Sequence, residues 1–379
     1  MSQTTITTDN IMTVDAANIT GAALPALNGA ALTNIPGVTN GAGDPLVSTN
    51  PSAVGAAWLN TTTGNLFCCT DATAGANIWI NVGSGSGSKR PYWHEIGTVA
   101  GFAMGGTSPD NVIIDRYPFA SNTTATDHGD LTIAKLEFDG CSSNTDGYGV
   151  AGTALGVGPS NVIDKFSFAS TANATDFGDT TVARYAPATC GSNTHGYAAG
   201  GDGPSNVIDK FAYGSNANAT DVGDLTGGYY ASGGHSSETH GYVSGGYPPG
   251  QSKIDKFSFS SNGNATGHGN LTAAKYYCPS LSGPEDGYIA GGFFAASPQT
   301  DQVEKFSYAS NTTAASHGTL VSNMYGMATT QNGTTGFLAG GAQGSVVATI
   351  RTFSFETSNQ NATHGSLSAA RRKMAGTND

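Results

Sequence analysis

The chain is poor in charge, above all in positive charge. Lys and Arg together number 15 against 27 Asp and Glu among 379 residues, which gives a formal net charge of −12. Binding to nucleic acid needs a basic surface against the phosphates, so we expect no nucleic-acid partner. No run approaches the roughly twenty apolar residues that a transmembrane helix requires. The opening residues, MSQTTITTDN, lack the basic and apolar regions of a secretory signal, and we expect no membrane insertion.

Cysteine is also scarce, and its placement excludes the usual cysteine-based sites. There are five cysteines, an odd number, and Cys68 and Cys69 are adjacent, which suits neither a disulfide framework nor a zinc site. Cys141 and Cys190 each lie six residues after a basic residue, at equivalent places in two repeats. We interpret them as small apolar side chains that fill a core.

Catalytic motifs are missing as well. No phosphate-binding Walker loop, GxSxG elbow or HExxH zinc motif is present. The run ATDFGDT at 174–180 lacks the leading serine and closing tryptophan of the sialidase Asp box, and the six arginines do not cluster as carboxylate recognition would need. The sequence therefore predicts a protein that is not an enzyme, with no catalytic residues, no metal and no cofactor.

What the chain does have is glycine, 54 residues of it, and a repeat. An aromatic residue followed by a run of small residues recurs at separations of 46, 49, 45, 46 and 49 positions. The six markers are Phe102, Tyr148, Tyr197, Tyr242, Tyr288 and Phe337. Repeats of this length indicate a solenoid, propeller or array.

Each repeat predicts four short β-strands. A strand such as GYVSGG ends in glycines, and a variable loop leads to a second strand such as NVIDKFSF. A polar turn, a Leu-Thr strand and a basic residue before a fourth strand complete the unit, and no helical period occurs. One such sheet cannot bury both faces, whereas six around an axis can. The predicted fold is all-β, a six-bladed β-propeller.

The repeat resembles the kelch motif over roughly residues 96–379. The resemblance lies in the Gly-Gly end of the aromatic strand, the NVIDKFSF-type strand and a downstream basic residue, present as Lys135, Arg184, Lys275 and Arg371. Two units depart from it, with Tyr229 and Met324 at the basic position, and the late tryptophan of kelch repeats is absent. Since the sixth unit stops after LSAARRKMAGTND, we expect the C-terminal strand to join IGTVAGFAMGG at 96–106 in one blade, which removes exposed edges.

Two other residue types recur once per repeat. Acidic residues occupy one strand position, beside a Lys or Arg, and predict ion pairs between blades or solvated strand faces: Asp115, Asp164, Asp209, Asp255 and Glu304. Four histidines precede the glycine of one turn, too far apart around a ring to share a metal. We interpret these as residues that cap a strand: His128, His268, His317 and His364.

The first ninety residues have a different character. Residues 1–45 carry GAAL twice and too few apolar positions for a core, and we interpret them as an attachment and oligomerisation segment. Residues 46–83 predict a small three-stranded β module, residues 84–90 a Gly/Ser linker, and residues 91–379 the propeller. The N-terminal region resembles the attachment part of bacteriophage tail-fibre proteins. That resemblance implies other virion proteins as partners and a homo-oligomer, a trimer.

The variable loops are the candidate recognition surface. Where sister units have DGPSN, the fourth has YPPGQS and the fifth has FFAASPQTDQ. The candidate contact residues are Tyr247, Pro248, Phe293 and Phe294. Aromatic side chains on loops of a rigid scaffold suit stacking on sugars or docking of a protein. The alternative is that they fill gaps between blades.

Together these features predict a phage virion protein, a tail fibre or receptor-binding protein that presents its propeller to a glycan or protein of the host surface. The expected location is the virion, after assembly in the bacterial cytoplasm. Two alternatives remain open: an architectural component of the neck, baseplate or capsid, and a glycan-cleaving enzyme. An intracellular kelch-type adaptor fits less well, because residues 1–90 resemble no partner-docking domain.

Overall fold

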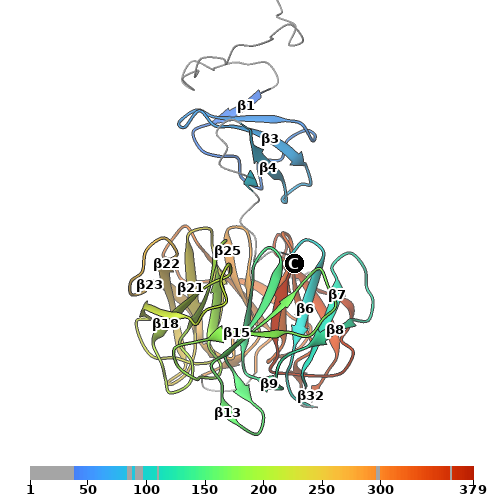
Figure 1. The fold of residues 1–379 in the computed structure, drawn as a ribbon, viewed down its shortest axis with the longest axis vertical. Coiled ribbons are helices and arrows are strands. Elements are labelled where there is room, and N and C mark those ends of the chain that lie inside the picture. The colour runs from blue at the N-terminus through green and yellow to red at the C-terminus, as the bar shows by residue number, and fades with distance from the viewer. Residues whose placement is uncertain (1–37, 83–87, 90–96, 109–110, 296–298, 359–360) are drawn as a thin grey trace, which may run out of the picture. The chain divides into compact units, whose positions relative to one another are not determined.

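A computed structural model describes residues 38–82, 88–89, 97–108, 111–295, 299–358 and 361–379. The chain divides into two compact units, Met1–Pro91 and Tyr92–Asp379. Throughout the described residues the regular structure is β-strand, mostly in small antiparallel sheets, so the all-β expectation is confirmed (Figure 1). The described part of the chain holds no helix that is long and apolar enough to cross a membrane.

The first unit contains one five-stranded sheet in the order β1-β2-β3-β4-β5. Its strands are β1 (Val38–Gly41), β2 (Ala57–Asn60), β3 (Leu66–Asp71), β4 (Ile78–Asn81) and β5 (Ser88–Lys89). The expected three-stranded module at 46–83 spans β2, β3 and β4, while β1 adds a parallel strand before it and β5 an antiparallel strand after it. Phe67, Cys69 and Trp79 are buried at its core. Residues 1–37 of the attachment segment expected at 1–45 lie outside the described residues. So do residue 83 of the expected module and residues 84–87 and 90 of the linker expected at 84–90.

The second unit contains six four-stranded antiparallel sheets, numbered here in chain order. Sheet 1 is β35 (Ala375–Asn378), β6 (Ala100–Met104), β7 (Ile113–Pro118) and β8 (Thr126–Asp130). Sheet 2 is β10 (Asp139–Ser142), β11 (Asp146–Val150), β14 (Val162–Ser167) and β15 (Thr175–Asp179). Sheet 3 is β16 (Ala188–Gly191), β17 (His195–Ala199), β18 (Val207–Ala212) and β19 (Thr220–Asp224).

The remaining three sheets follow the same order of strands. Sheet 4 is β20 (Gly233–Ser236), β21 (His240–Ser244), β22 (Gln251–Ser258) and β23 (Thr266–Tyr276), extended by β26 (Phe293–Phe294). Sheet 5 is β24 (Ser280–Ser282), β25 (Asp286–Ala290), β27 (Gln302–Ser307) and β28 (Ala315–Thr319). Sheet 6 is β29 (Ala328–Gln331), β30 (Thr335–Ala339), β33 (Thr349–Ser354) and β34 (Asn361–Ser366). Short pairings in the connections involve β9 (Lys135–Leu136), β12 (Thr153–Ala154), β13 (Gly158–Pro159), β31 (Ala342–Gln343) and β32 (Ser345–Val346).

The hydrophobic cores lie between sheets rather than within them. Six clusters of buried residues each draw on two neighbours: sheets 1 and 2, 2 and 3, 3 and 4, 4 and 5, 5 and 6, and 6 and 1. The first strand of each sheet, called the inner strand below, contacts the inner strands of both neighbouring sheets. Sheet 1 combines β35 from the end of the chain with β6 to β8, and Thr377 lies opposite Phe102 in its register.

Ring stacking across these interfaces explains the repeated aromatic markers. Tyr148 of sheet 2 stacks on Tyr213, which follows the third strand of sheet 3, at 4.8 Å between ring centroids. The marker Phe337 of sheet 6 contacts Phe119 of sheet 1 at 4.5 Å between ring centroids, with the two rings tilted by 34°. Offset or edge contacts between aromatic rings add stabilisation beyond the area that they bury. The spacing of the repeat therefore reflects a requirement for one ring at every sheet interface.

The repeated histidines also act between sheets. His128 on β8 hydrogen-bonds the carbonyl oxygen of Ser167 at the end of β14, 2.8 Å away in the next sheet. His268, His317 and His364 make the same bond to Ser307, Ser354 and Pro118. Each of the four sits where an outer strand meets its neighbour, so the residue ties two sheets together rather than capping its own strand. In sheets 2 and 3 the position is held by Phe177 and Val222.

A fifth histidine predicts a specific loss of stability in acid. His235 is buried in the inner strand β20, where its Nδ1 lies 3.0 Å from the carbonyl oxygen of Leu281 and its Nε2 lies 2.9 Å from Ser244 Oγ. Burial lowers the pKa of His235 to about 4, against about 6.5 in an unfolded chain. Between these values the folded state binds fewer protons, so stability falls as the pH drops from 6.5 towards 4.

We expect His235→Gln to remove about 2 kcal/mol of the stability difference between pH 7 and pH 4.5. Urea unfolding of both proteins at the two pH values measures that difference. An unchanged pH dependence in the variant would show that other groups account for the acid sensitivity.

Candidate functional site

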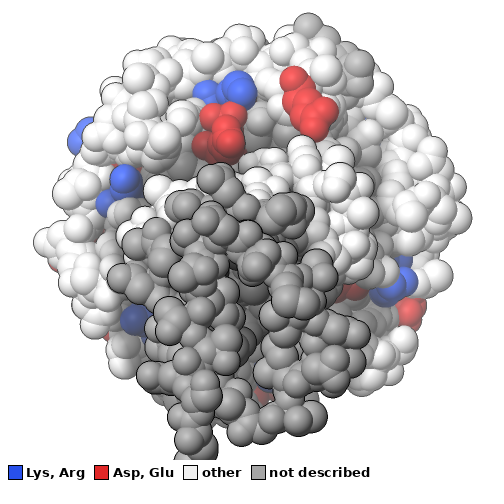
Figure 2. Space-filling view, turned by 90° about the horizontal axis from the view of Figure 1, so that it is seen from above, with Lys and Arg blue, Asp and Glu red and all other residues white. Residues whose placement is uncertain are grey.

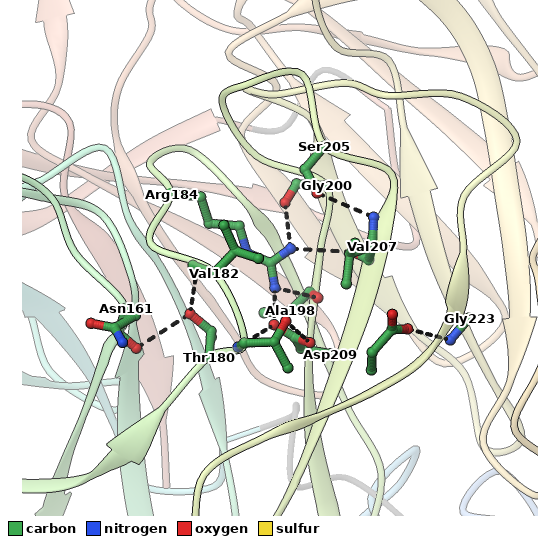
Figure 3. Close-up of polar contacts among 12 residues, drawn as sticks. Asn161, Thr180, Val182, Arg184, Ala198, Gly200, Ser205, Val207, Asp209 and Gly223 are labelled. Carbon is green, nitrogen blue, oxygen red and sulfur yellow. Dashed lines mark hydrogen bonds and ion pairs between the residues drawn. The ribbon is translucent and has the colours of Figure 1, made fainter.

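The connections between sheets are held by buried ion pairs. Arg184 lies in the connection from sheet 2 to sheet 3 and pairs with Asp209 on β18, both side chains being fully buried (Figure 3). The Arg184 guanidinium also donates to the carbonyl oxygens of Gly200 at 2.9 Å and Val207 at 3.2 Å. Asp209 in turn accepts from the hydroxyl of Thr181 at 2.7 Å. The pair thus fixes the incoming connection against the strand that it crosses.

Equivalent pairs join three other connections to the sheets that follow them. They are Lys135–Asp164, Lys275–Glu304 and Arg371–Asp115, each with nitrogen and oxygen 2.6 Å apart and both side chains fully buried. The interpretation of the repeated acids as ion pairs is confirmed at these four positions. Their partner, however, is the basic residue of the preceding connection and not the Lys or Arg beside them in the sequence, because neighbouring side chains on a strand point to opposite faces.

Two interfaces lack such a pair within the described residues. At sheet 4, Asp255 accepts hydrogen bonds from the backbone and hydroxyl of Thr226, and Tyr229 occupies the basic position. Burial raises the pKa of Asp255. At sheet 6 the basic position holds the buried Met324, and Arg351 at the acidic position bonds Gln343 instead. These acidic and basic residues are therefore accounted for as parts of the scaffold.

The variable loops gather on one face of the second unit. Each variable loop joins the second strand of a sheet to the third. The connection from the fourth strand to the inner strand of the next sheet lies on the same side. These loops and connections together are called the loop face. β9, β13 and β32 lie there, at the lower end of Figure 1, whereas the C-terminus lies at the opposite end. Residue 98 meets the C-terminal residue there, with Thr98 N donating to Asp379 O. The chain therefore enters and leaves the unit away from the loop face. Figure 2 views the molecule from the upper end of Figure 1, and few of the described residues seen there are Lys, Arg, Asp or Glu.

Six aromatic side chains form a continuous row on the loop face, called the aromatic arc below. In order they are Tyr185, Tyr230, Tyr247, Tyr276, Phe293 and Tyr325. Successive ring centroids lie 5.8, 5.6, 5.5, 5.4 and 4.6 Å apart. Tyr247 is 40% exposed and the other five are half-buried. The arc begins at the connection into sheet 3 and ends at the connection into sheet 6, so it covers part of the face.

The arc includes two of the four candidate residues, and the other two lie beside it. Phe293 stacks on Tyr276 with an interplanar angle of 15°. Phe294, its neighbour on β26, packs instead against Lys275, whose Nζ lies 5.2 Å from the ring centroid. Pro248 is exposed and follows Tyr247 through a cis peptide bond. The sequence did not single out Tyr185, Tyr230, Tyr276 and Tyr325, because each stands in a connection next to the basic repeat position.

The backbone pairing at these positions does not require aromatic rings. The same positions in other sheets form the same backbone bridges with different side chains, as in Thr107 with Arg372 and Thr153 with Leu136. In the arc the corresponding pairs are Tyr230 with Tyr247 and Tyr276 with Phe293. Since the bridge forms without aromatic residues, the backbone pairing by itself does not explain why rings occupy these positions.

A second set of residues on the loop face occupies equivalent positions in the connections between sheets. Six equivalent residues, each two positions after the basic position, have left-handed backbone conformations with φ between 48° and 65°. They are Glu137, Ala186, Ala231, Tyr277, Gly326 and Lys373. Four pairs of neighbours among these residues are joined by backbone hydrogen bonds. The amide nitrogen of the first residue donates to the carbonyl oxygen of the second in Glu137–Lys373 (3.1 Å), Ala186–Glu137 (2.6 Å), Ala231–Ala186 (2.9 Å) and Lys373–Gly326 (2.7 Å).

The six residues with left-handed backbone conformations are called the corner residues below. Three of them interact with one another through their side chains. The Tyr277 hydroxyl donates to Glu137 Oε1 at 2.6 Å, and Lys373 Nζ lies 2.6 Å from the same oxygen. Tyr277 belongs to the connection into sheet 5 and Glu137 to that into sheet 2, on opposite sides of the series of six. Burial and the nearby Glu137 carboxylate raise the pKa of Tyr277 well above its ordinary value. The phenol therefore stays a hydrogen-bond donor at any physiological pH.

All six corner residues line a cavity of about 80 Å³. Asp139 stands on its wall, and its carboxylate accepts from the backbone nitrogens of Gly140 and Thr189, both at 2.9 Å. Burial raises the pKa of Asp139 to about 6. Among the described residues no cluster of His, Cys, Asp or Glu is arranged to hold a metal ion. The five cysteines, all within the described residues, form no disulfide, and all but the half-buried Cys68 are buried.

Comparison with known proteins adds no family to this description. A scan against models of protein families finds no match, and a search of curated sequences finds no relative. The functional argument therefore depends on the geometry of the loop face.

Proposed function

We propose that the second unit is a six-bladed, kelch-like β-propeller. Six four-stranded sheets of one topology, with a core between each pair of neighbours including sheets 6 and 1, support that arrangement. Pairing of β35 with β6 would join the two ends of the unit in one blade. The ion pair of Arg371 with Asp115 and the contact of Phe119 with Phe337 support closure at the same interface.

We further propose that the protein is a bacteriophage virion protein, a tail fibre or receptor-binding protein, whose loop face recognises the host surface. The observation that carries this proposal is the aromatic arc: partly exposed rings at positions where the scaffold accepts other side chains. Binding residues are concentrated on loops held by a rigid framework. The resemblance of the N-terminal region to tail-fibre attachment segments supports a role for it in joining other virion proteins and in forming a homo-oligomer, a trimer.

The position of the chain ends fits presentation of this face. The chain enters the second unit beside Asp379, on the side away from the loops. A unit attached through its N-terminal side thus leaves the arc accessible. The repeated acids and histidines hold sheets together, so the proposal needs no catalysis. Its expected location is the virion, after assembly in the bacterial cytoplasm.

Binding to bacterial cells tests this function. We expect the labelled full-length protein to bind a subset of a panel of bacterial strains, and the double substitution Tyr247→Ala with Phe293→Ala to weaken that binding at least tenfold, as removal of aromatic anchors does at other interfaces. Val99→Ser is the control, because Val99 is 53% exposed beside the entry of the chain, away from the loop face.

Equal binding by the double variant would contradict recognition through the arc. A protein that bound no strain would point instead to the architectural role in the neck, baseplate or capsid. Far-UV circular dichroism and the thermal midpoint of each variant show whether the loss of binding reflects a loss of fold.

A further inference from the structure

We propose that the ligand of the aromatic arc is an uncharged saccharide chain. This inference rests on the proposed function, since it names the chemical class that the same face would recognise. Three properties of the arc lead to it: the kind of ring that it contains, the hydrogen-bonding groups that those rings present, and the state of the charged groups around them.

The arc presents phenols rather than purely apolar surface. Five of its six rings are tyrosines, and within the described residues the hydroxyls of Tyr230, Tyr247 and Tyr276 have no hydrogen-bond partner. A phenol offers an apolar ring face together with one donor and acceptor group. A pyranose has the complementary pattern, with C–H groups on its faces and hydroxyls around its rim. A chain of sugars can therefore stack on the rings and exchange hydrogen bonds with the three free hydroxyls.

Three cations near the arc are already engaged. Arg372 donates to the hydroxyl of Tyr325, Lys373 is paired with Glu137, and Lys275 is buried with Glu304. Recognition of carboxylate, sulfate or phosphate groups depends on available Arg or Lys side chains. The chain as a whole carries a formal charge of −12, which repels polyanions. These charges favour a neutral saccharide over an acidic one.

The exposure of the arc argues against a protein as its partner. A stable protein interface buries about 800 Å² on each side, with an apolar centre. The rings of the arc pack against one another, and Tyr247 is its only member among the large, exposed apolar side chains of the described residues. The half-buried rings therefore expose only part of their surface in a narrow row, which suits a linear chain of sugars.

Affinity electrophoresis of the full-length protein tests the ligand class. Native gels would contain dextran, mannan or galactan as neutral probes, or carboxymethyl-dextran as the acidic counterpart of the first. We expect at least one neutral polymer to retard the protein, and to retard it more than carboxymethyl-dextran does. The triple substitution Tyr230→Phe, Tyr247→Phe and Tyr276→Phe keeps every ring and should weaken binding at least tenfold, because three hydrogen bonds are lost. Val99→Ser should bind like the unaltered protein.

Three results would overturn the inference: no retardation by any neutral polymer, retardation by the carboxymethyl polymer that equals or exceeds that by every neutral polymer, or unchanged binding by the triple variant. Chemical treatment of bound bacterial strains separates this failure from failure of the proposed function. If protease abolishes cell binding and periodate does not, the arc recognises a surface protein, and the saccharide inference falls while the recognition function stands. If the arc variants bind cells as well as the original protein does, the recognition function itself falls.

Discussion

Replacing Arg371 with alanine is expected to lower the free energy of unfolding of the second unit by about 3–5 kcal/mol, the usual loss when one member of a buried ion pair is removed. Arg371 is fully buried and bonds Asp115 at 2.6 Å, together with the carbonyl oxygens of Gly105 at 2.8 Å and Ile113 at 3.1 Å. The variant leaves that carboxylate and both carbonyls without this partner. Urea unfolding followed by far-UV circular dichroism measures the change.

Two further variants show whether the loss comes from burial. Lys305 pairs with Asp286 at 2.8 Å but is 37% exposed, so Lys305→Ala should cost less than about 1 kcal/mol. Replacing both Arg371 with Met and Asp115 with Leu should recover much of the loss, because no unpaired charge then remains. If Arg371→Ala and Lys305→Ala were equally mild, the buried pair would contribute little to the fold.

Gly234→Ala is expected to destabilise the unit by about 3 kcal/mol, the upper end of the usual range for overpacking. Gly234 lies on the inner strand β20, and a Cβ atom there would stand 1.9 Å from the carbonyl oxygen of Thr189 on the neighbouring inner strand β16. The atom in the way belongs to the backbone, so no side chain can rotate to make room. Urea unfolding is again the measurement.

Gly267→Ala is the matched control for this substitution. Gly267 lies on β23 in an exposed position, and a Cβ atom there would have no neighbour within 4 Å. The control should change the free energy of unfolding by less than about 0.5 kcal/mol. A Gly234→Ala protein as stable as the control would mean that the inner strands tolerate a wider separation.

The sequence alone predicted much of the scaffold because its determinants recur. An aromatic marker, a glycine pair and a basic residue return in unit after unit, and each has one structural cause: a stacked ring, a turn and an ion pair. The partner of each acid was the exception. Asp209 stands beside Lys210, yet its salt bridge is with Arg184, 25 positions away. Strand periodicity could have excluded the adjacent lysine, but choosing among distant partners requires the packing of the sheets.

The candidate site was predicted only in part, for a related reason. Tyr247 and Phe293 stand out because their loops differ from those of sister repeats, whereas Tyr230 and Tyr276 become part of the arc only when the sheets are packed. The hydrogen bond between Tyr277 and Glu137 joins residues 140 positions apart. Alignment of the repeats could have found the six corner residues, which share one offset from the basic position. It could not have shown that their side chains meet.

The meeting of residue 98 with the C-terminal residue in sheet 1 has a practical consequence. Thr98 N donates to Asp379 O at 2.6 Å, so in the second unit alone a short peptide could join Asp379 to the start of the unit without disturbing the strands. New ends could then be opened in a hairpin turn of another sheet, since exposed turns are the places where circular permutation succeeds. Each choice of turn would place the new chain ends in a different sheet, beside a different interface between sheets. A fluorescent or affinity tag added at Asp379 would emerge beside the entry point of the chain and leave the row of tyrosines unobstructed.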